Sequence, residues 1–260
     1  MVNIDPLNYS SILAAVEIPH FHADTTSPSR INTRPSNLYH LSCIMNQKTA
    51  IRITVMILGL FIMSLGIAVS TKSGLGTTPI SCVPYVLSQG FPLSFGTFTF
   101  LMNCLFVVFQ YFLLKDKFEI YQWLQIPLIF VFSVFTDISM ILVGDLIVTG
   151  YVFQWIFCLI SCVLVGFGIA LLLKANLLMM AGDALVRALS LVSKIQFGYT
   201  KVGFDSTMVL TAVLISWILF ADLVGVREGT IAAAVLVGLI VKFFIPRLEC
   251  LDHIFMEKSC

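Results

Sequence analysis

Six stretches of this sequence are long and apolar enough to cross a membrane as α-helices. A spanning helix needs about 20 mostly apolar residues to cross a hydrocarbon layer about 30 Å thick. Hydrophobic residues make up 58% of the chain and charged residues 11%, a balance that no water-soluble surface requires. We therefore predict an all-α protein whose immediate partner is the lipid bilayer, with spans at about 51–71, 96–114, 122–143, 150–173, 200–221 and 229–246.

Two intervals between these spans, 72–95 and 174–199, are too long for tight turns and too interrupted to cross the membrane. Each is predicted to hold a short helix. Thr78-Pro79 offers a cap residue followed by proline at the first helical position, and Gly182-Asp183 places a carboxylate near exposed N–H groups. Two placements stay open for these short helices, one re-entering toward the midplane and one lying flat at the interface.

The spans define one membrane domain over 45–248 with a tail at each end. Residues 1–44 are polar and carry scattered serine, threonine and proline, so we expect a disordered tail. Met45 is followed directly by Asn-Gln-Lys and the first apolar stretch, which suggests that translation starts there. Residues 249–260 form the C-terminal tail.

Lysine and arginine set the predicted orientation, because cytoplasmic ends of membrane proteins collect them. With the N-terminus inside, only Lys72 and Arg227 of the 15 basic residues fall outside. We therefore expect a protein of the bacterial plasma membrane with both termini in the cytoplasm.

The sequence repeats itself after 102 residues without a gap. Between 66 and 96, nine positions are identical to those 102 residues later, including Gly66-Ile67-Ala68 with Gly168-Ile169-Ala170. Gly74 also aligns with Asn176, and both residue types tolerate left-handed backbone. The match predicts two repeats, about 51–143 and 150–246. Because each holds three spans, the second would cross the membrane upside down relative to the first, as in many secondary transporters.

Ionisable residues at membrane depth are the best candidates for a functional site, since each costs at least ~2.5 kcal/mol on insertion scales. Asp137 lies in the otherwise apolar third span. It is a functional group, or it hydrogen-bonds a neighbouring helix, or its side chain reaches the outer interface. Asp205 in the fifth span aligns with Asn103 in the second. This pair either faces a substrate or joins helices by hydrogen bonds.

Asp183 and Arg187 complete the candidate site residues. They stand four apart on the short helix predicted within 174–199, so they would share a face and form a surface ion pair worth a few tenths of a kcal/mol. All five residues, Asn103, Asp137, Asp183, Arg187 and Asp205, are assigned as substrate-binding candidates.

Several classes of function are excluded by what the sequence lacks. A net charge of +1 leaves no basic face for nucleic acid. The four histidines lie in the tails and the seven cysteines are scattered, so we expect no metal site and no cofactor. The sequence has no G-x-S-x-G or H-E-x-x-H motif, which argues against an enzyme.

Short apolar motifs follow one another along the whole membrane domain. They are Leu58-Gly59 to Ala68, Lys72 to Pro79, Leu93 to Thr97, Lys174-Ala175-Asn176, Gly182 to Leu185, Glu228 to Ile231 and Val237-Gly238. In order and spacing, over about 50–246, these motifs resemble the YczE/YyaS/YitT family of bacterial integral membrane proteins. The resemblance implies a membrane protein of uncharacterised activity and transfers no site residues. This chain departs from the family at 177–180, where Leu-Leu-Met-Met replaces a glycine-rich loop.

Two functions fit these features. The first is a secondary transporter or permease for a small solute, favoured by the repeat and by the few polar groups at depth. The second is a non-transporting membrane partner or substrate-binding subunit of a larger complex. Association into a homo-oligomer stays open.

Overall fold

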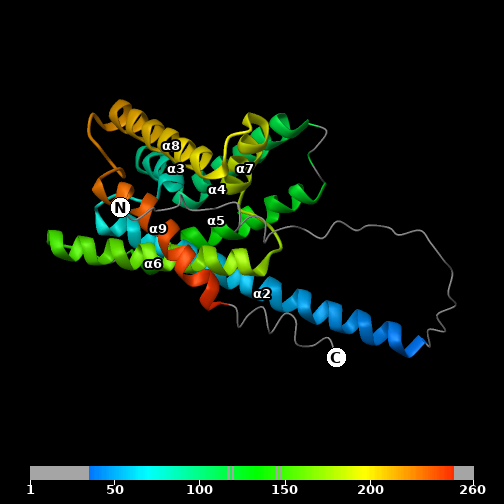
Figure 1. Ribbon diagram of the computed structural model, residues 1–260. Helices are drawn as coiled ribbons and strands as arrows, with labels where there is room; N and C mark the ends of the chain where they lie inside the picture. Colours follow the sequence, from blue (N-terminus) through cyan, green and yellow to red (C-terminus); the bar gives the residue numbers. More distant parts are fainter. Residues whose placement is uncertain (1–34, 116–117, 119, 145, 147, 249–260) are drawn as a thin grey trace, which may run out of the picture.

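The computed structural model describes residues 35–248, except 116–117, 119, 145 and 147. Side chains are described from residue 49 onward, apart from those same residues and 120–121. These residues form eight α-helices and one 3-10 helix, η2 (Figure 1). In chain order the elements are α2 (Pro35–Ser73), α3 (Pro79–Gly90), α4 (Phe95–Leu114), η2 (Ile120–Leu124), α5 (Gln125–Leu142), α6 (Tyr151–Ala175), α7 (Ala181–Ser193), α8 (Phe197–Phe220) and α9 (Glu228–Arg247).

Six of these helices are long and apolar enough to cross a membrane, at the places predicted from the sequence. They are Thr49–Ser73 within α2, Phe95–Leu114, Gln122–Leu142, Tyr151–Ala175, Phe197–Phe220 and Glu228–Arg247. Large apolar side chains cover their outer surfaces, among them Ile141 and Ile218. The prediction of six spans and an all-helical membrane domain is therefore confirmed for the described residues.

The first helix begins earlier than predicted. It starts at Pro35 rather than near residue 51, so 35–44, which we expected to be disordered, are helical. Proline suits the first position of a helix, and no glycine or proline follows until Gly59. The remainder of the predicted N-terminal tail, 1–34, and the C-terminal tail, 249–260, lie outside the described residues.

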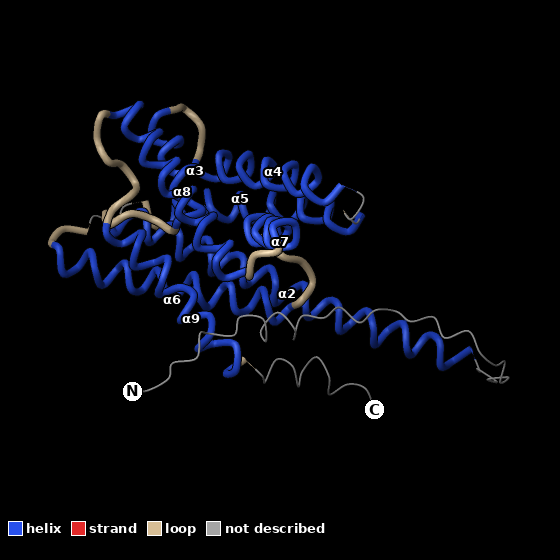
Figure 2. Tube along the Cα trace, turned by 45° about the horizontal axis from the view of Figure 1, so that its top comes forward, coloured by secondary structure: helices blue, strands red, loops and turns tan. Residues whose placement is uncertain are grey.

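The long helices α2 and α6 cross at the centre of the molecule through small residues. A Cβ atom at Gly66 would lie 2.8 Å from the backbone nitrogen of Val165, and one at Gly168 would lie 2.7 Å from that of Met63. Glycine at these positions lets the two backbones approach closely, which drives helix association where lipid supplies no hydrophobic force. α5 packs on the other side of α2, and α9 packs on α6 (Figure 2).

The two short helices exist as predicted, in α3 and α7. Both have buried N-terminal ends, at Pro79 and at Ala181-Gly182, and both end at exposed residues. Each is preceded by a left-handed residue after a long helix, Gly74 with φ +73° and Asn176 with φ +46°, as expected from their alignment. α3 packs on α8 and α4, and α7 packs on α4 and α8.

The caps of the short helices follow the prediction in position. Thr78 precedes Pro79 at the start of α3, but its hydroxyl donates to Oγ of Ser81 at 3.0 Å instead of capping a backbone N–H. Met180 is the N-cap of α7, which places Asp183 in the first turn.

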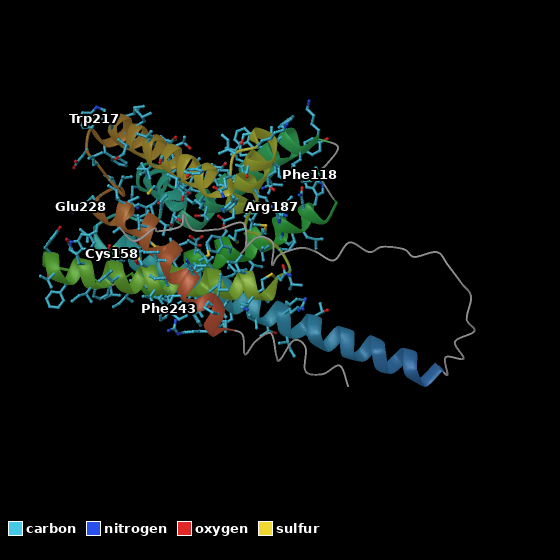
Figure 3. All side chains as sticks on the ribbon, viewed as in Figure 1. Phe118, Cys158, Arg187, Trp217, Glu228 and Phe243 are labelled. Atoms are coloured by element: carbon cyan, nitrogen blue, oxygen red, sulfur yellow. The ribbon has the colours of Figure 1, made fainter. Side chains whose placement is uncertain are left out.

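The α8–α9 loop and the α4–α5 connection lie at opposite ends of the molecule. Trp217 and Glu228, which flank the α8–α9 loop, lie at one end, and Phe118 and Arg187 lie toward the other (Figure 3). The connections α4–α5 and α7–α8 are therefore at the same end of the bundle.

The close crossing of α2 and α6 can be tested with Gly168→Ala. The new methyl group would meet the backbone of α2, so we expect a loss of about 1–3 kcal/mol and a lower Tm in detergent. Gly203→Ala in α8 is the matched control, because no described atom lies within 4 Å of its Cβ position. A Gly168→Ala protein that melts with the wild type would contradict this packing.

Candidate functional site

A lysine held between two aspartates forms the most distinctive polar cluster among the described side chains. Nζ of Lys201 lies 3.0 Å from Oδ1 of Asp183 and 3.2 Å from Oδ1 of Asp205. Lys201 and Asp205 stand four apart on α8, and Asp183 comes from the first turn of α7. Exposure of the three side chains is 28% for Lys201, 33% for Asp183 and 18% for Asp205. We call these three residues the ion-pair cluster.

The hairpin of α7 and α8 brings the cluster together well inside the span. Asp205 stands eight residues after Phe197 at the start of α8, hence about 12 Å along the helix at a rise of 1.5 Å per residue. Asp183 is near the N-terminus of α7, where the helix dipole stabilises a carboxylate. Charges at such depth are tolerated when they pair with one another, and the two carboxylates outnumber the ammonium group.

The predicted ion pair between Asp183 and Arg187 is wrong. Asp183 binds Lys201 instead, and Nη1 of Arg187 lies 3.6 Å from Sδ of Met179. The reason is tertiary, since α8 packs against α7 and presents an ammonium group to Asp183. Lys201 was not among the predicted site residues. Its position four residues before Asp205 on one helix was the signal in the sequence for an ion pair between the two.

The first turns of α3 and α7 meet beside this cluster. A Cβ atom at Gly182 would lie 3.2 Å from Cδ1 of Ile80. The rings of Phe106 on α4 and Phe204 on α8 are 5.5 Å apart, in an edge-on arrangement with an interplanar angle of 68°. N-terminal turns carry unpaired N–H groups and a partial positive charge, so two such ends converge where α4 and α8 touch.

The equivalent positions of the first half are polar but uncharged. Ser81, Thr99 and Asn103 stand 102 residues before Asp183, Lys201 and Asp205, and all three are buried. Nδ2 of Asn103 donates to the carbonyl of Thr99 in its own helix at 2.8 Å. Asp205 is thus brought together with Asp183, while the predicted partner Asn103 is bonded within α4.

Gln110 is a further buried polar residue that sequence analysis overlooked. It is fully buried, and its Nε2 donates to the carbonyl of Ala181 at 3.0 Å. The bond ties the C-terminal part of α4 to the start of α7. A glutamine among apolar residues in a span is itself a signal for such a contact between helices.

Asp137 binds the start of α4. Its Oδ1 accepts the N–H of Gly96 at 2.7 Å, and its Oδ2 accepts the hydroxyl of Ser94 at 2.7 Å. Ser94 is also the N-cap of α4 and accepts the N–H of Thr97. The interpretation in which Asp137 hydrogen-bonds a neighbouring helix is therefore confirmed. Both carboxylate oxygens accept a hydrogen bond from the start of α4.

Comparison with known proteins places the chain in a family. Residues 50–246 match the family of unknown function DUF6198. The chain belongs to this family. Its match covers all six spans and both short helices, so the ion-pair cluster and the Asp137 contact both lie in the part that the family shares.

Three relatives have been described as uncharacterised proteins of bacteria. YyaS of Bacillus subtilis is 26% identical over 193 residues, covering 74% of this chain and 91% of the relative. A protein of Haemophilus influenzae is 30% identical over 210 residues, covering 79% and 88%. The membrane protein YczE of Bacillus subtilis is 28% identical over 217 residues, covering 83% and 95%.

These relatives confirm the resemblance to YczE and YyaS, and the YitT part of it stays a prediction. The family member described here is a multi-pass membrane protein like YczE. No solved structure matches it.

Removing the lysine of the cluster should destabilise the protein. In Lys201→Met the two carboxylates would face each other without a cation, so we expect a loss of about 1–3 kcal/mol, reduced by the partial exposure of the site. Adding Asp205→Asn should recover part of it. Melting in detergent measures both, with Lys194→Met in the exposed turn before α8 as the control. Equal melting of Lys201→Met and Lys194→Met would contradict the pairing.

Proposed function

We propose that this membrane protein is a secondary transporter for a small solute. The observation that carries the proposal is the ion-pair cluster, which lies at membrane depth beside the converging first turns of α3 and α7. Ionisable residues inside a membrane protein commonly mark substrate and ion pathways. Half-helices whose N-termini point toward the midplane are a recurrent element of transporter sites.

The two halves, about 51–143 and 150–246, are proposed to be inverted repeats. α3 begins at Pro79 and α7 at Ala181, and α4 begins at Phe95 and α8 at Phe197, each 102 residues apart. The contacts between halves are also exchanged, since α3 packs on α8 as α7 packs on α4. This is the pattern expected of a two-fold axis passing between the halves.

Individual contacts support the same axis. Gly66 faces Val165, and Gly168 faces Met63. Met63 and Val165 are themselves 102 residues apart, so one contact becomes the other when the halves are exchanged. Ile80 and Gly182, also 102 apart, touch each other, as residues on the axis must. The short helices would then re-enter the membrane from opposite faces.

The chemistry of the ion-pair cluster suits a site that exchanges a charge. Its single ammonium group holds two carboxylates, so protonation of one carboxylate, or arrival of a cationic group beside it, would weaken the hold on Lys201. Binding of a proton or solute could therefore alter the contact between α7 and α8. Nothing in this mechanism requires a covalent reaction, and we propose no enzymatic role.

Transport can be tested on the purified protein in liposomes. Charge displacement on a solid-supported membrane, screened over small solutes and at several pH values, should show signals for the wild type. Asp205→Asn and Lys201→Met should reduce them at least tenfold while the proteins stay folded, and Lys194→Met should leave them unchanged. Signals that survive both cluster variants would contradict the site. Uptake that depends strictly on a co-purifying subunit would favour the alternative of a non-transporting partner.

The proposed orientation places both termini and the α7–α8 turn in the cytoplasm and the α8–α9 loop outside. A cysteine replacing Lys194 should then be protected from an impermeant maleimide in intact cells, while one replacing Asp222 should react. Both residues are exposed, so the rest of the described chain does not hide either from the reagent. Labelling at Lys194 alone would reverse the orientation, and labelling of both would contradict three spans per repeat.

A further inference from the structure

The two halves differ most in how α4 and α8 meet the last helix of their own half. α4 packs along α5, whereas α8 and α9 form no comparable interface among the described residues. α3 lies between α8 and α9 and contacts both (Figure 1). The helix pair α4 and α5 is therefore in contact in the first half, whereas the corresponding pair α8 and α9 is separated in the second half.

The glycines that start these helices show the difference at atomic scale. A Cβ atom at Gly96 would clash with the carbonyl of Ser133 and with the carboxylate of Asp137. Its partner in the repeat, Gly198, has no described atom within 4 Å of the same position. Gly96 is thus pressed against α5, while Gly198 faces open space.

The faces of α5 and α9 also differ, since the face of α5 beside Gly96 is buried and residues of α9 are exposed. On α5, Ser133 is buried and its hydroxyl donates to the carbonyl of Gly96 at 2.9 Å. On α9, Val235 and Leu239 stand 102 residues after Ser133 and Asp137, and they are 60% and 52% exposed. Both side chains are therefore largely uncovered among the described residues.

We infer that these two interfaces are alternating gates, that Asp137 is the latch of the closed one, and that Val235 and Leu239 form the vacant dock for the start of α8. The inference rests on the proposed transport function and its inverted repeats. Exchanging the conformations of the two halves gives a second arrangement, in which Gly198 lies against α9 and α4 withdraws from α5.

The proposed orientation gives each gate a side. Gly96 and Asp137 lie where α4 begins and α5 approaches its end, toward the outer surface. Gly198 lies at the inner start of α8. The arrangement seen here is closed to the outside and open toward the cytoplasm, and Lys201 and Asp205 of the ion-pair cluster lie on the helix that would move.

The latch explains which gate is closed. Asp137 satisfies the N–H of Gly96 and the hydroxyl of Ser94 at the start of α4, and a charged acceptor makes these bonds stronger than neutral ones. Leu239 offers no such acceptor to the start of α8. The polar bonds therefore favour closure of the first half over closure of the second.

Pairs of spin labels at equivalent positions can report both gates. Labels at Leu101 and Ile141 span the outer gate, and labels 102 residues later, at Gly203 and Phe243, span the inner gate. All four positions are exposed. Distances are measured by pulsed electron spin resonance on the full chain in nanodiscs.

Asp137→Leu makes the first half resemble the second, so the outer distance should lengthen and the inner distance should shorten. Leu239→Asp supplies an acceptor for the N–H of Gly198. This substitution on α9 should shorten the inner distance as Asp137→Leu on α5 does. Asp222→Asn in the outer loop is the control and should leave both distances unchanged. Circular dichroism and elution volume establish that each variant is folded.

The inference is overturned if neither distance responds in either variant, or if both gates lengthen together. Liposome assays keep it separate from the proposed function. If the protein takes up solute while neither spin-label distance changes in the variants, the proposed transport function stands and the inference of alternating gates is wrong. Opposed changes of the two distances in a protein that moves no solute support the two arrangements and count against transport.

Discussion

The absence of water from the bilayer interior is the constraint on which this structure depends. Each backbone N–H and C=O at depth must bond within the protein, and long helices satisfy this requirement by themselves. The breaks after α2 and α6 do not, and at the first of them other parts of the chain supply the hydrogen-bond partners. At the first break Nη1 of Arg227 donates to the carbonyl of Gly74 at 3.0 Å, and the N–H of Gly229 donates to that of Leu75 at 2.9 Å. The isolated bridge between Gly76 and Val226 adds to this cover.

The same constraint decides where the side-chain polar groups lie. Serine and threonine hydroxyls in the spans mostly donate to a carbonyl one turn earlier, as Thr99 does to Phe95. Longer groups bridge elements instead, as Gln110 does to Ala181 and Asp137 to Gly96. The charged residues at depth are each held by a defined partner, which makes the cost of their burial tolerable. Their contacts join the moving parts that we propose, α4 with α5 and α7 with α8.

The proposed inverted repeats make the differences between the two halves informative. Two copies of one unit could adopt the same conformation, yet α4 is bonded to α5 while no described atom lies within 4 Å of the Cβ position of Gly198 on α8. The charges are divided too, with the ion-pair cluster in the second half and neutral hydroxyl and amide groups at the same positions in the first. A transporter that alternates between two arrangements needs its two halves to differ in conformation at any moment. Exchanging the two conformations between the halves then gives the second arrangement.

The sequence by itself determined the six spans, the two short helices, the repeat and the residues that could carry charge into the membrane. These follow from local properties: apolar length, proline and glycine placement, and the 102-residue alignment. Only the tertiary structure decided the partners. Asp183 binds Lys201 rather than Arg187, Asn103 bonds within α4, and Asp137 caps a neighbouring helix. The physical reason is that periodicity places a side chain on a face of its own helix, whereas the helix that covers this face comes from a distant part of the chain.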